Sequence, residues 1–182
     1  MNINDYNKIY FIGNNTEIDN NTINKLDISK NDLIILFNKQ ICLKFNKIKN
    51  HKNKIIFLRC NGASWWGLSE YIKNKNIYLK AYFVYSKDAN ALIYDDIKCT
   101  NLIYNIQSEI FVTNKKVPQT GWIAYNFIKD TLNINFHKTS IYLIGFTNEY
   151  KSNTWNLHSK EIEQDFFRNE IDNHKNMTKI DK

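Results

Sequence analysis

The sequence has little proline, glycine and cysteine. One of its 182 residues is proline, Pro118, and five are glycine. The three cysteines, Cys42, Cys60 and Cys99, are odd in number and form no CxxC pair. This spacing argues against a disulfide framework or a zinc knuckle. We therefore expect a reducing compartment. His51, His137 and His174 show no ligand spacing, so we expect no metal site.

Long apolar runs are lacking as well. No segment approaches the ~18 consecutive apolar residues that a membrane-spanning helix needs. The first ten residues, MNINDYNKIY, lack the apolar run of a signal peptide. We interpret the protein as cytoplasmic, with peripheral contact on the inner face of the membrane as a further option.

Arginine is scarce, although the chain is basic. Only Arg59 and Arg168 are arginines, so lysine supplies nearly all of the positive charge behind the net charge of +7. Sequence-specific nucleic-acid readers rely on the bidentate guanidinium, so we do not expect nucleic acid as a partner. Lysine suits diffuse attraction to an anionic membrane, a phosphorylated glycolipid or a nucleotide. A solvated basic surface without a partner is the alternative.

The apolar residues that are present gather in short runs. Hydrophobic residues make up 43% of the chain, which indicates one globular domain over residues 1–182. Runs typical of buried parallel strands are KIYFIGN (8–14), DLIILFN (32–38) and KIIFLRCNG (54–62). Further strands are expected at 77–85, 101–106, 109–113 and 140–146, and helices at 66–73, 121–132 and 158–171, with a frayed tail over 173–182. The pattern predicts a Rossmann-like α/β domain with a mostly parallel sheet and helices on both faces.

Polar residues follow several of these elements. Asn14 and Asn38 end two strands, Thr120 and Gly121 begin a helix with Thr120 as its N-cap, and His158 heads the last helix. Strand-end amides can hold a base or a ribose, and a helix start offers N–H groups to a phosphate. A helix cap and a surface histidine are the structural alternatives.

Four motifs follow one another along residues 8 to 167. They are FIGNN, in which Asn15 replaces a second glycine, then DLIILFN, then QTGWIAYNFIKDTLNINFHKTSIYLIGF, and last HSKEIE, in which Glu163 follows His158 by five positions. In order and spacing they resemble the CMP-sialic-acid-dependent sialyltransferases, more closely the small bacterial enzymes that decorate lipooligosaccharide.

The resemblance implies an inverting glycosyltransferase. Its donor, a substrate and no cofactor, would be CMP-sialic acid or a related ulosonic acid, and its acceptor a glycan or glycolipid. It implies that the donor is held by Gly13, Asn14, Asn15, Asn38, Thr120, Gly121 and Glu163. His158 would be the general base, because imidazole has a pKa near neutral, and Tyr150 would donate to the leaving phosphate.

The chain departs from the family pattern between Gly145 and His158. The family carries an acceptor-covering lid there, and this chain has only twelve residues, which predicts a reduced lid. The acceptor site is then open, or closed by another subunit of a homo-oligomer, or transfer is lost. Two other functions stay open: a CMP-sugar binding protein or hydrolase, and a non-catalytic basic interaction module. GASWWG (62–67) is either an aromatic platform for the acceptor or a cover for the sheet edge.

Overall fold

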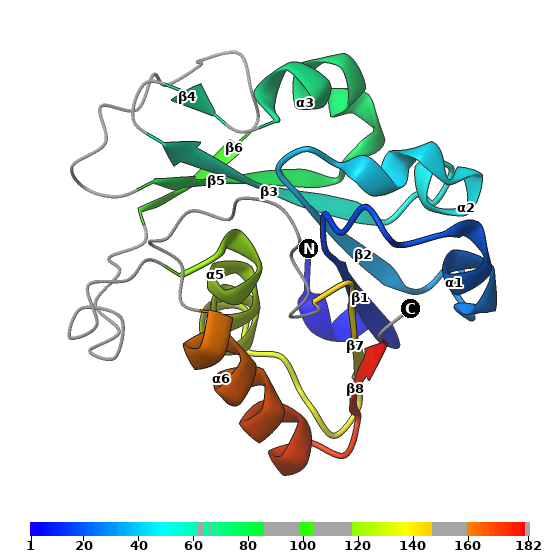
Figure 1. The fold of residues 1–182 in the computed structure, drawn as a ribbon, viewed down its shortest axis with the longest axis vertical. Helices are drawn as coiled ribbons and strands as arrows, with labels where there is room; N and C mark the ends of the chain where they lie inside the picture. Colours follow the sequence, from blue (N-terminus) through cyan, green and yellow to red (C-terminus); the bar gives the residue numbers. More distant parts are fainter. Residues whose placement is uncertain (62–63, 66, 86–98, 104–117, 147–159, 181–182) are drawn as a thin grey trace.

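An eight-stranded sheet forms the centre of the molecule (Figure 1). The computed structural model describes residues 1–61, 64–65, 67–85, 99–103, 118–146 and 160–180. The strands are β1 (Lys8–Ile12), β2 (Leu33–Phe37), β3 (Lys54–Asn61), β4 (Ser64–Trp65), β5 (Lys80–Tyr85), β6 (Cys99–Ile103), β7 (Ser140–Ile144) and β8 (Met177–Ile180). Seven of them lie in the order β6-β5-β3-β2-β1-β7-β8 and pair in parallel, while β4 pairs antiparallel with β3.

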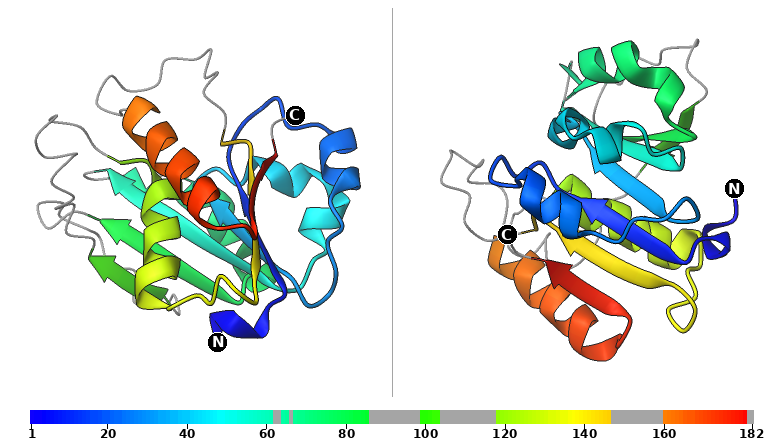
Figure 2. Two further views of the ribbon diagram at one scale, coloured as in Figure 1. Left: turned by 90° about the horizontal axis from the view of Figure 1, so that it is seen from below. Right: turned by 90° about the vertical axis from the view of Figure 1, so that its right-hand side faces the viewer.

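Helices cover both faces of the sheet (Figures 1 and 2). The α-helices are α1 (Asn20–Lys25), α2 (Asn46–Lys49), α3 (Leu68–Asn74), α5 (Thr120–Asn126) and α6 (Lys160–Asn173). Short 3-10 turns are η1 (Ile3–Asp5), η2 (Ile41–Lys44) and η3 (Lys75–Ile77), and a π-helical turn, η4 (Phe127–Thr131), continues α5. Helices α5 and α6 cover one face, and α1, α2 and α3 cover the other. The predicted α/β architecture with a parallel sheet is confirmed.

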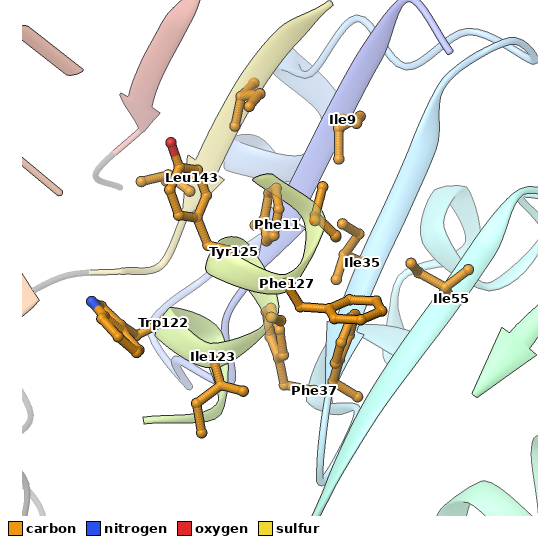
Figure 3. Close-up of a cluster of buried hydrophobic side chains, with 14 of the residues drawn as sticks. Ile9, Phe11, Ile35, Phe37, Ile55, Trp122, Ile123, Tyr125, Phe127 and Leu143 are labelled. Atoms are coloured by element: carbon orange, nitrogen blue, oxygen red, sulfur yellow. The ribbon is translucent and has the colours of Figure 1, made fainter. Parts of the chain in front are cut away.

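The face beneath α5 and α6 holds the larger core. Successive strand residues point to opposite faces, so Ile9 and Phe11 of β1 face α5 while Tyr10 and Ile12 face α1. Figure 3 shows the side chains of α5 meeting those of β1, β2, β3 and β7. Because both faces are covered, β1, β2 and β3 read as the continuous apolar runs seen in the sequence.

Helix α5 is buried on several sides, as its dense apolar sequence predicts. Trp122, Ile123, Ala124 and Tyr125 are all buried although they are consecutive. Strand residues cover part of this surface, and Phe166 of α6 packs against Trp122 and Tyr125 at ring-centroid distances of 5.5 and 5.9 Å. The start of α5 is therefore held between the sheet and α6.

Two predictions about helix and chain ends are wrong. Gln119, not Thr120, is the N-cap of α5, and Thr120 is its first helical residue. The tail predicted to fray over 173–182 contains β8, which adds to the sheet beside β7. Met177 is buried in the core under α5 and α6, which explains why this polar segment is ordered.

Several predictions fall outside the described residues. These are the strand at 109–113, half of GASWWG (62, 63 and 66) and residues 147–157 of the predicted reduced lid. Within the part of the chain that the structure describes, no helix is long and apolar enough to cross a membrane.

Candidate functional site

The strand order reverses between β1 and β7. Strands β2, β3, β5 and β6 extend the sheet on one side of β1, and β7 and β8 extend it on the other. In open parallel sheets, ligands bind outside the carboxyl ends of the strands at such a reversal. We call this side of the sheet, where Ile12, Phe37, Asn61 and Ile144 end their strands, the carboxyl edge.

Two glycines bring the chain ends of β1 and β7 close together at the carboxyl edge. The Gly13 N–H donates to the carbonyl of Ile144 at 2.8 Å. A Cβ on Gly13 would lie 2.8 Å from the carbonyl oxygen of Gly145, which is too close for any side chain. Gly145 has a φ of 69°, and a Cβ there would lie 2.6 Å from Ile18 Cδ1. Gly13 is thus required by packing, whatever it does for a ligand.

Asn14 follows and connects two neighbouring turns. Its Nδ2 donates to the carbonyl of Phe37 at 2.8 Å, and its Oδ1 accepts from the Ile41 N–H at 3.4 Å. Asn15 has a different role, because its Oδ1 accepts from the Glu17 N–H at 2.9 Å and closes a local turn. Both asparagines therefore lie at the carboxyl edge, as expected, with the Asn14 amide shaping the end of β2.

Asn38 joins three elements that are distant in sequence. Its Nδ2 donates to Thr120 Oγ1 at 3.2 Å, and its Oδ1 accepts from the Arg59 N–H at 3.0 Å. The backbone of Asn38 is left-handed, with a φ of 41°. The structure thus brings together two of the residues predicted to bind the donor, one after β2 and one at the start of α5.

A second layer of polar contacts fixes the backbone of Asn38. Gln40 Nε2 donates to the carbonyl oxygens of Asn38, at 3.0 Å, and Gly67, at 3.2 Å. The Tyr78 hydroxyl donates to Gln40 Oε1 at 2.7 Å, and burial raises the pKa of this hydroxyl. Gly67 approaches so closely that a Cβ there would lie 2.0 Å from the Asn38 carbonyl oxygen. This network keeps the Asn38 amide directed at α5.

Glu163 lies on α6 and is only 7% exposed. Its Oε1 accepts from the Gln119 N–H at 2.6 Å, so this carboxyl group, and not Thr120, satisfies the first backbone donor of α5. Burial raises the pKa of Glu163 to about 8, and the hydrogen bond from Gln119 and the charge of Arg59 oppose that rise. Glu163 therefore acts on the predicted site through the start of α5.

Arg59 is a site residue that the sequence analysis missed. It lies near the carboxyl end of β3, and its guanidinium donates to the carbonyl of Pro118. Burial lowers its pKa, and the nearby Glu163 raises it. The signal that the sequence offered was chemical: Arg59 is one of only two arginines, and it directly follows the apolar run IIFL (55–58) of a predicted strand.

Gly121 has a packing role that competes with its predicted one. A Cβ on Gly121 would lie 2.6 Å from Cε1 of the Phe146 ring. Phe146 also packs against Phe37 and Phe167, at ring-centroid distances of 6.0 and 5.5 Å. The ring of Phe146 thus covers Gly121. Because glycine has no side chain, position 121 leaves room for that ring.

The predicted catalytic pair is His158 and Tyr150. Both residues lie outside the described residues.

Among the residues that are described, no group of three or more His, Cys, Asp and Glu side chains could hold a metal ion. Cys42 is buried, and burial raises the pKa of its thiol to about 12. Comparisons with family models, curated proteins and solved structures find no match for this chain.

Proposed function

We propose that the protein is an inverting glycosyltransferase that moves sialic acid, or a related ulosonic acid, from a CMP-activated donor to a glycan hydroxyl. The observation that supports this most is the hydrogen bond between Asn38 Nδ2 and Thr120 Oγ1 at 3.2 Å. It joins two motifs of the family resemblance at the carboxyl edge, beside the reversal of strand order where nucleotides bind in related architectures.

The chemistry of these two side chains suits a nucleotide. An amide nitrogen carries two hydrogens, so Asn38 can donate to Thr120 and to a ligand at the same time. A threonine hydroxyl that accepts from Asn38 keeps its own hydrogen to donate to a phosphate or carboxylate oxygen. The contact therefore positions the Thr120 hydroxyl and leaves its hydrogen available to donate to a ligand.

In the proposed transfer, the acceptor hydroxyl oxygen attacks the anomeric carbon of the sugar. The hydroxyl proton passes to the imidazole of His158, and the bond between the anomeric carbon and the phosphate oxygen breaks, with its electron pair leaving on CMP. The Tyr150 hydroxyl would donate to that phosphate. The roles of these two residues come from the family resemblance.

Thermal shift and calorimetric titration with CMP, UMP and AMP test the donor site. We expect CMP to raise the melting temperature more than UMP or AMP does. Thr120→Val should weaken CMP binding about fivefold to tenfold, because it removes a hydroxyl that donates to an anionic group. Thr139→Val is the matched control, since Thr139 is also buried but its hydroxyl donates to Tyr6 at the amino ends of the strands. Equal effects of both variants on CMP binding would contradict the proposed site.

Transfer itself is tested with CMP-sialic acid and a galactose-terminated acceptor. His158→Ala should still bind CMP but lose transfer, whereas equal transfer by this variant and the wild type would exclude His158 as the base. Release of free sugar by the wild type without glycosylated acceptor would instead support the hydrolase alternative. Binding of CMP with neither reaction would support a binding protein.

A further inference from the structure

We infer that Arg59 binds an oxyanion of the donor, the phosphate of CMP or the carboxylate of the sugar, at the carboxyl edge. This rests on the proposed function in so far as the ligand is a CMP-sugar. Arg59 matches none of the motifs that carry the family resemblance, and its placement comes from the structure alone.

Two hydrogen bonds and its position in strand β3 place Arg59 beside the two proposed donor-binding residues. Its backbone N–H donates to Asn38 Oδ1 at 3.0 Å. Its guanidinium donates to the carbonyl of Pro118, two positions before Thr120. Its side chain also lies on the α5 face of the sheet, because Arg59 is two residues after Phe57, and residues two apart in a strand share a face. Phe57 packs in the core beneath α5. The guanidinium is therefore next to the segment that carries the Thr120 hydroxyl.

Within the described residues, the positive charge of Arg59 is not fully balanced by a negatively charged carboxylate. Among the described residues, Glu163 is the one carboxyl group whose charge raises the pKa of Arg59. The charge of Arg59 in turn lowers the pKa of Glu163, against the larger effect of burial. Because burial raises the pKa of Glu163 to about 8, this carboxyl is mostly a neutral acid at pH 7. A half-buried cation beside a neutral acid is stabilised by an anion that enters the site.

The guanidinium suits this ligand better than the lysines that dominate the chain. Its planar fork donates two parallel hydrogen bonds to a phosphate or carboxylate, which fixes the orientation of the anion as well as attracting it. The backbone hydrogen bonds of Arg59 fix the position from which its side chain extends. A sequence that uses lysine almost everywhere else therefore places an arginine where directional binding is needed.

Calorimetric titrations of CMP and cytidine into the wild type and Arg59→Gln test the phosphate contact. We expect Arg59→Gln to weaken CMP binding at least about tenfold and leave cytidine binding unchanged, since a charge-assisted hydrogen bond is lost. Arg59→Lys keeps the charge but not the fork, and should fall between the two. Arg168→Gln is the matched control, because Arg168 is exposed on α6 and paired with Asp165. Circular dichroism and melting temperature establish that each variant is folded.

The carboxylate arm uses CMP-sialic acid in the same titrations. If Arg59→Gln weakens the binding of CMP-sialic acid but not of CMP, the anion is the carboxylate of the sugar. If the variant binds CMP, cytidine and CMP-sialic acid as the wild type does, the inference is overturned.

The pH dependence gives an independent arm. As pH rises through about 8, Glu163 ionises, and its carboxylate competes with the CMP phosphate for Arg59. CMP binding by the wild type should therefore weaken between about pH 7.5 and 9. The phosphate of CMP, with a second pKa near 6, is already fully ionised there. Glu163→Gln imitates the neutral acid and should remove this decline. An equal decline in the wild type and Glu163→Gln would contradict the inference.

The failure of this inference is distinguishable from that of the proposed function. If CMP does not bind the wild type, AMP, UMP and inorganic phosphate are titrated instead. Binding of any of these that Arg59→Gln weakens would keep the anion site and overturn the cytidylate function. No binding of any of them, or binding that Arg59→Gln leaves unchanged, would overturn the inference as well.

Discussion

At the scale of single residues, Asn38 meets two requirements at once. Its φ of 41° lies in the left-handed region, which asparagine tolerates better than most residues, and its amide contacts Thr120 and Arg59. Glycine would meet the first requirement and alanine neither. This difference allows the backbone and the amide to be tested separately.

Asn38→Ala and Asn38→Gly form such a pair. Both should lower the free energy of unfolding by roughly 1–3 kcal/mol, because the Arg59 N–H and Thr120 lose a partner. The alanine variant should lose about 1 kcal/mol more, since only it pays for the left-handed backbone. Urea denaturation measures both values, and CMP titration should show equally weakened binding. Retained CMP binding in either variant would remove the Asn38 amide from the donor site.

At the scale of elements, the junction between α5 and α6 depends on the protonation of Glu163. The neutral acid is favoured in the folded state, whose pKa for this group is about 8, while the unfolded chain has an ordinary glutamate pKa near 4.3. Between these values the folded protein binds a proton that the unfolded chain has released.

Stability should therefore fall as pH rises from about 5 to 8. Each pH unit in this window removes up to about 1.4 kcal/mol of unfolding free energy through Glu163, and the loss ends above pH 8. Glu163→Gln has no such ionisation, so its unfolding free energy should decline less over the same range. Denaturant titrations at several pH values measure the difference, and parallel curves for the two proteins would rule out the raised pKa.

Strand β8 gives a second test at this scale. Met177 is 4% exposed, and truncating a buried methionine to alanine removes about 2–5 kcal/mol of unfolding free energy. Thr178 is exposed on the same strand, so Thr178→Ala should change stability by less than about 0.5 kcal/mol. Thermal or urea denaturation compares the two. A negligible effect of Met177→Ala would mean that the segment is frayed after all.

The sequence predicts the central elements well because their signal is local. Strands β1, β2, β3 and β7 are continuous apolar runs, and burial on both faces produces that pattern. Strand β8 carries no such run, since Met177 and Ile180 are its only apolar residues. Its order comes from pairing with β7 and from the burial of Met177, neither of which shows as a local pattern. Helix α1 was missed for a similar reason, because it is polar and its start is set by the Asp19 side chain, which accepts from the Thr22 N–H.

In the candidate site, too, local sequence patterns predict some features, and contacts between distant segments determine the others. The placement of Asn14 and Asn38 at one edge was predictable, because residues that end parallel strands meet at one edge of the sheet. The contact of Glu163 with the start of α5, and the approach of Arg59 to Pro118, join segments far apart in the chain. No local pattern encodes such contacts. The family resemblance assigns Glu163 to the donor, and the sequence carries no signal for the hydrogen bond that its carboxyl group accepts from the Gln119 N–H.

At the scale of the whole molecule, charge is unevenly distributed. Residues 33–85 contain ten lysines and arginines and one acidic residue, Glu70, so this stretch carries +9 and the rest of the chain −2. It includes η2, α2, α3 and η3, which lie on the sheet face away from α5 and α6. We call the exposed lysines of these elements the basic face: Lys44, Lys49, Lys73 and Lys75.

We expect the basic face to attract an anionic membrane surface. Vesicles containing phosphatidylserine should bind the protein, and binding should fade as salt shortens the Debye length below about 10 Å. Replacing Lys44 and Lys49 by glutamate should reduce sedimentation with these vesicles. Replacing Lys138 and Lys175, which are exposed outside the basic stretch, should have a smaller effect. Equal loss in both double variants would mean that total charge alone governs binding.

The central claim is that distant polar residues form one cytidylate site at the carboxyl edge. A crystal structure of the protein with CMP bound tests it most directly. We predict that the nucleotide lies beside Gly13 and within hydrogen-bonding distance of Asn38 or Thr120. CMP bound at the amino ends of the strands, or on the basic face only, would contradict the account.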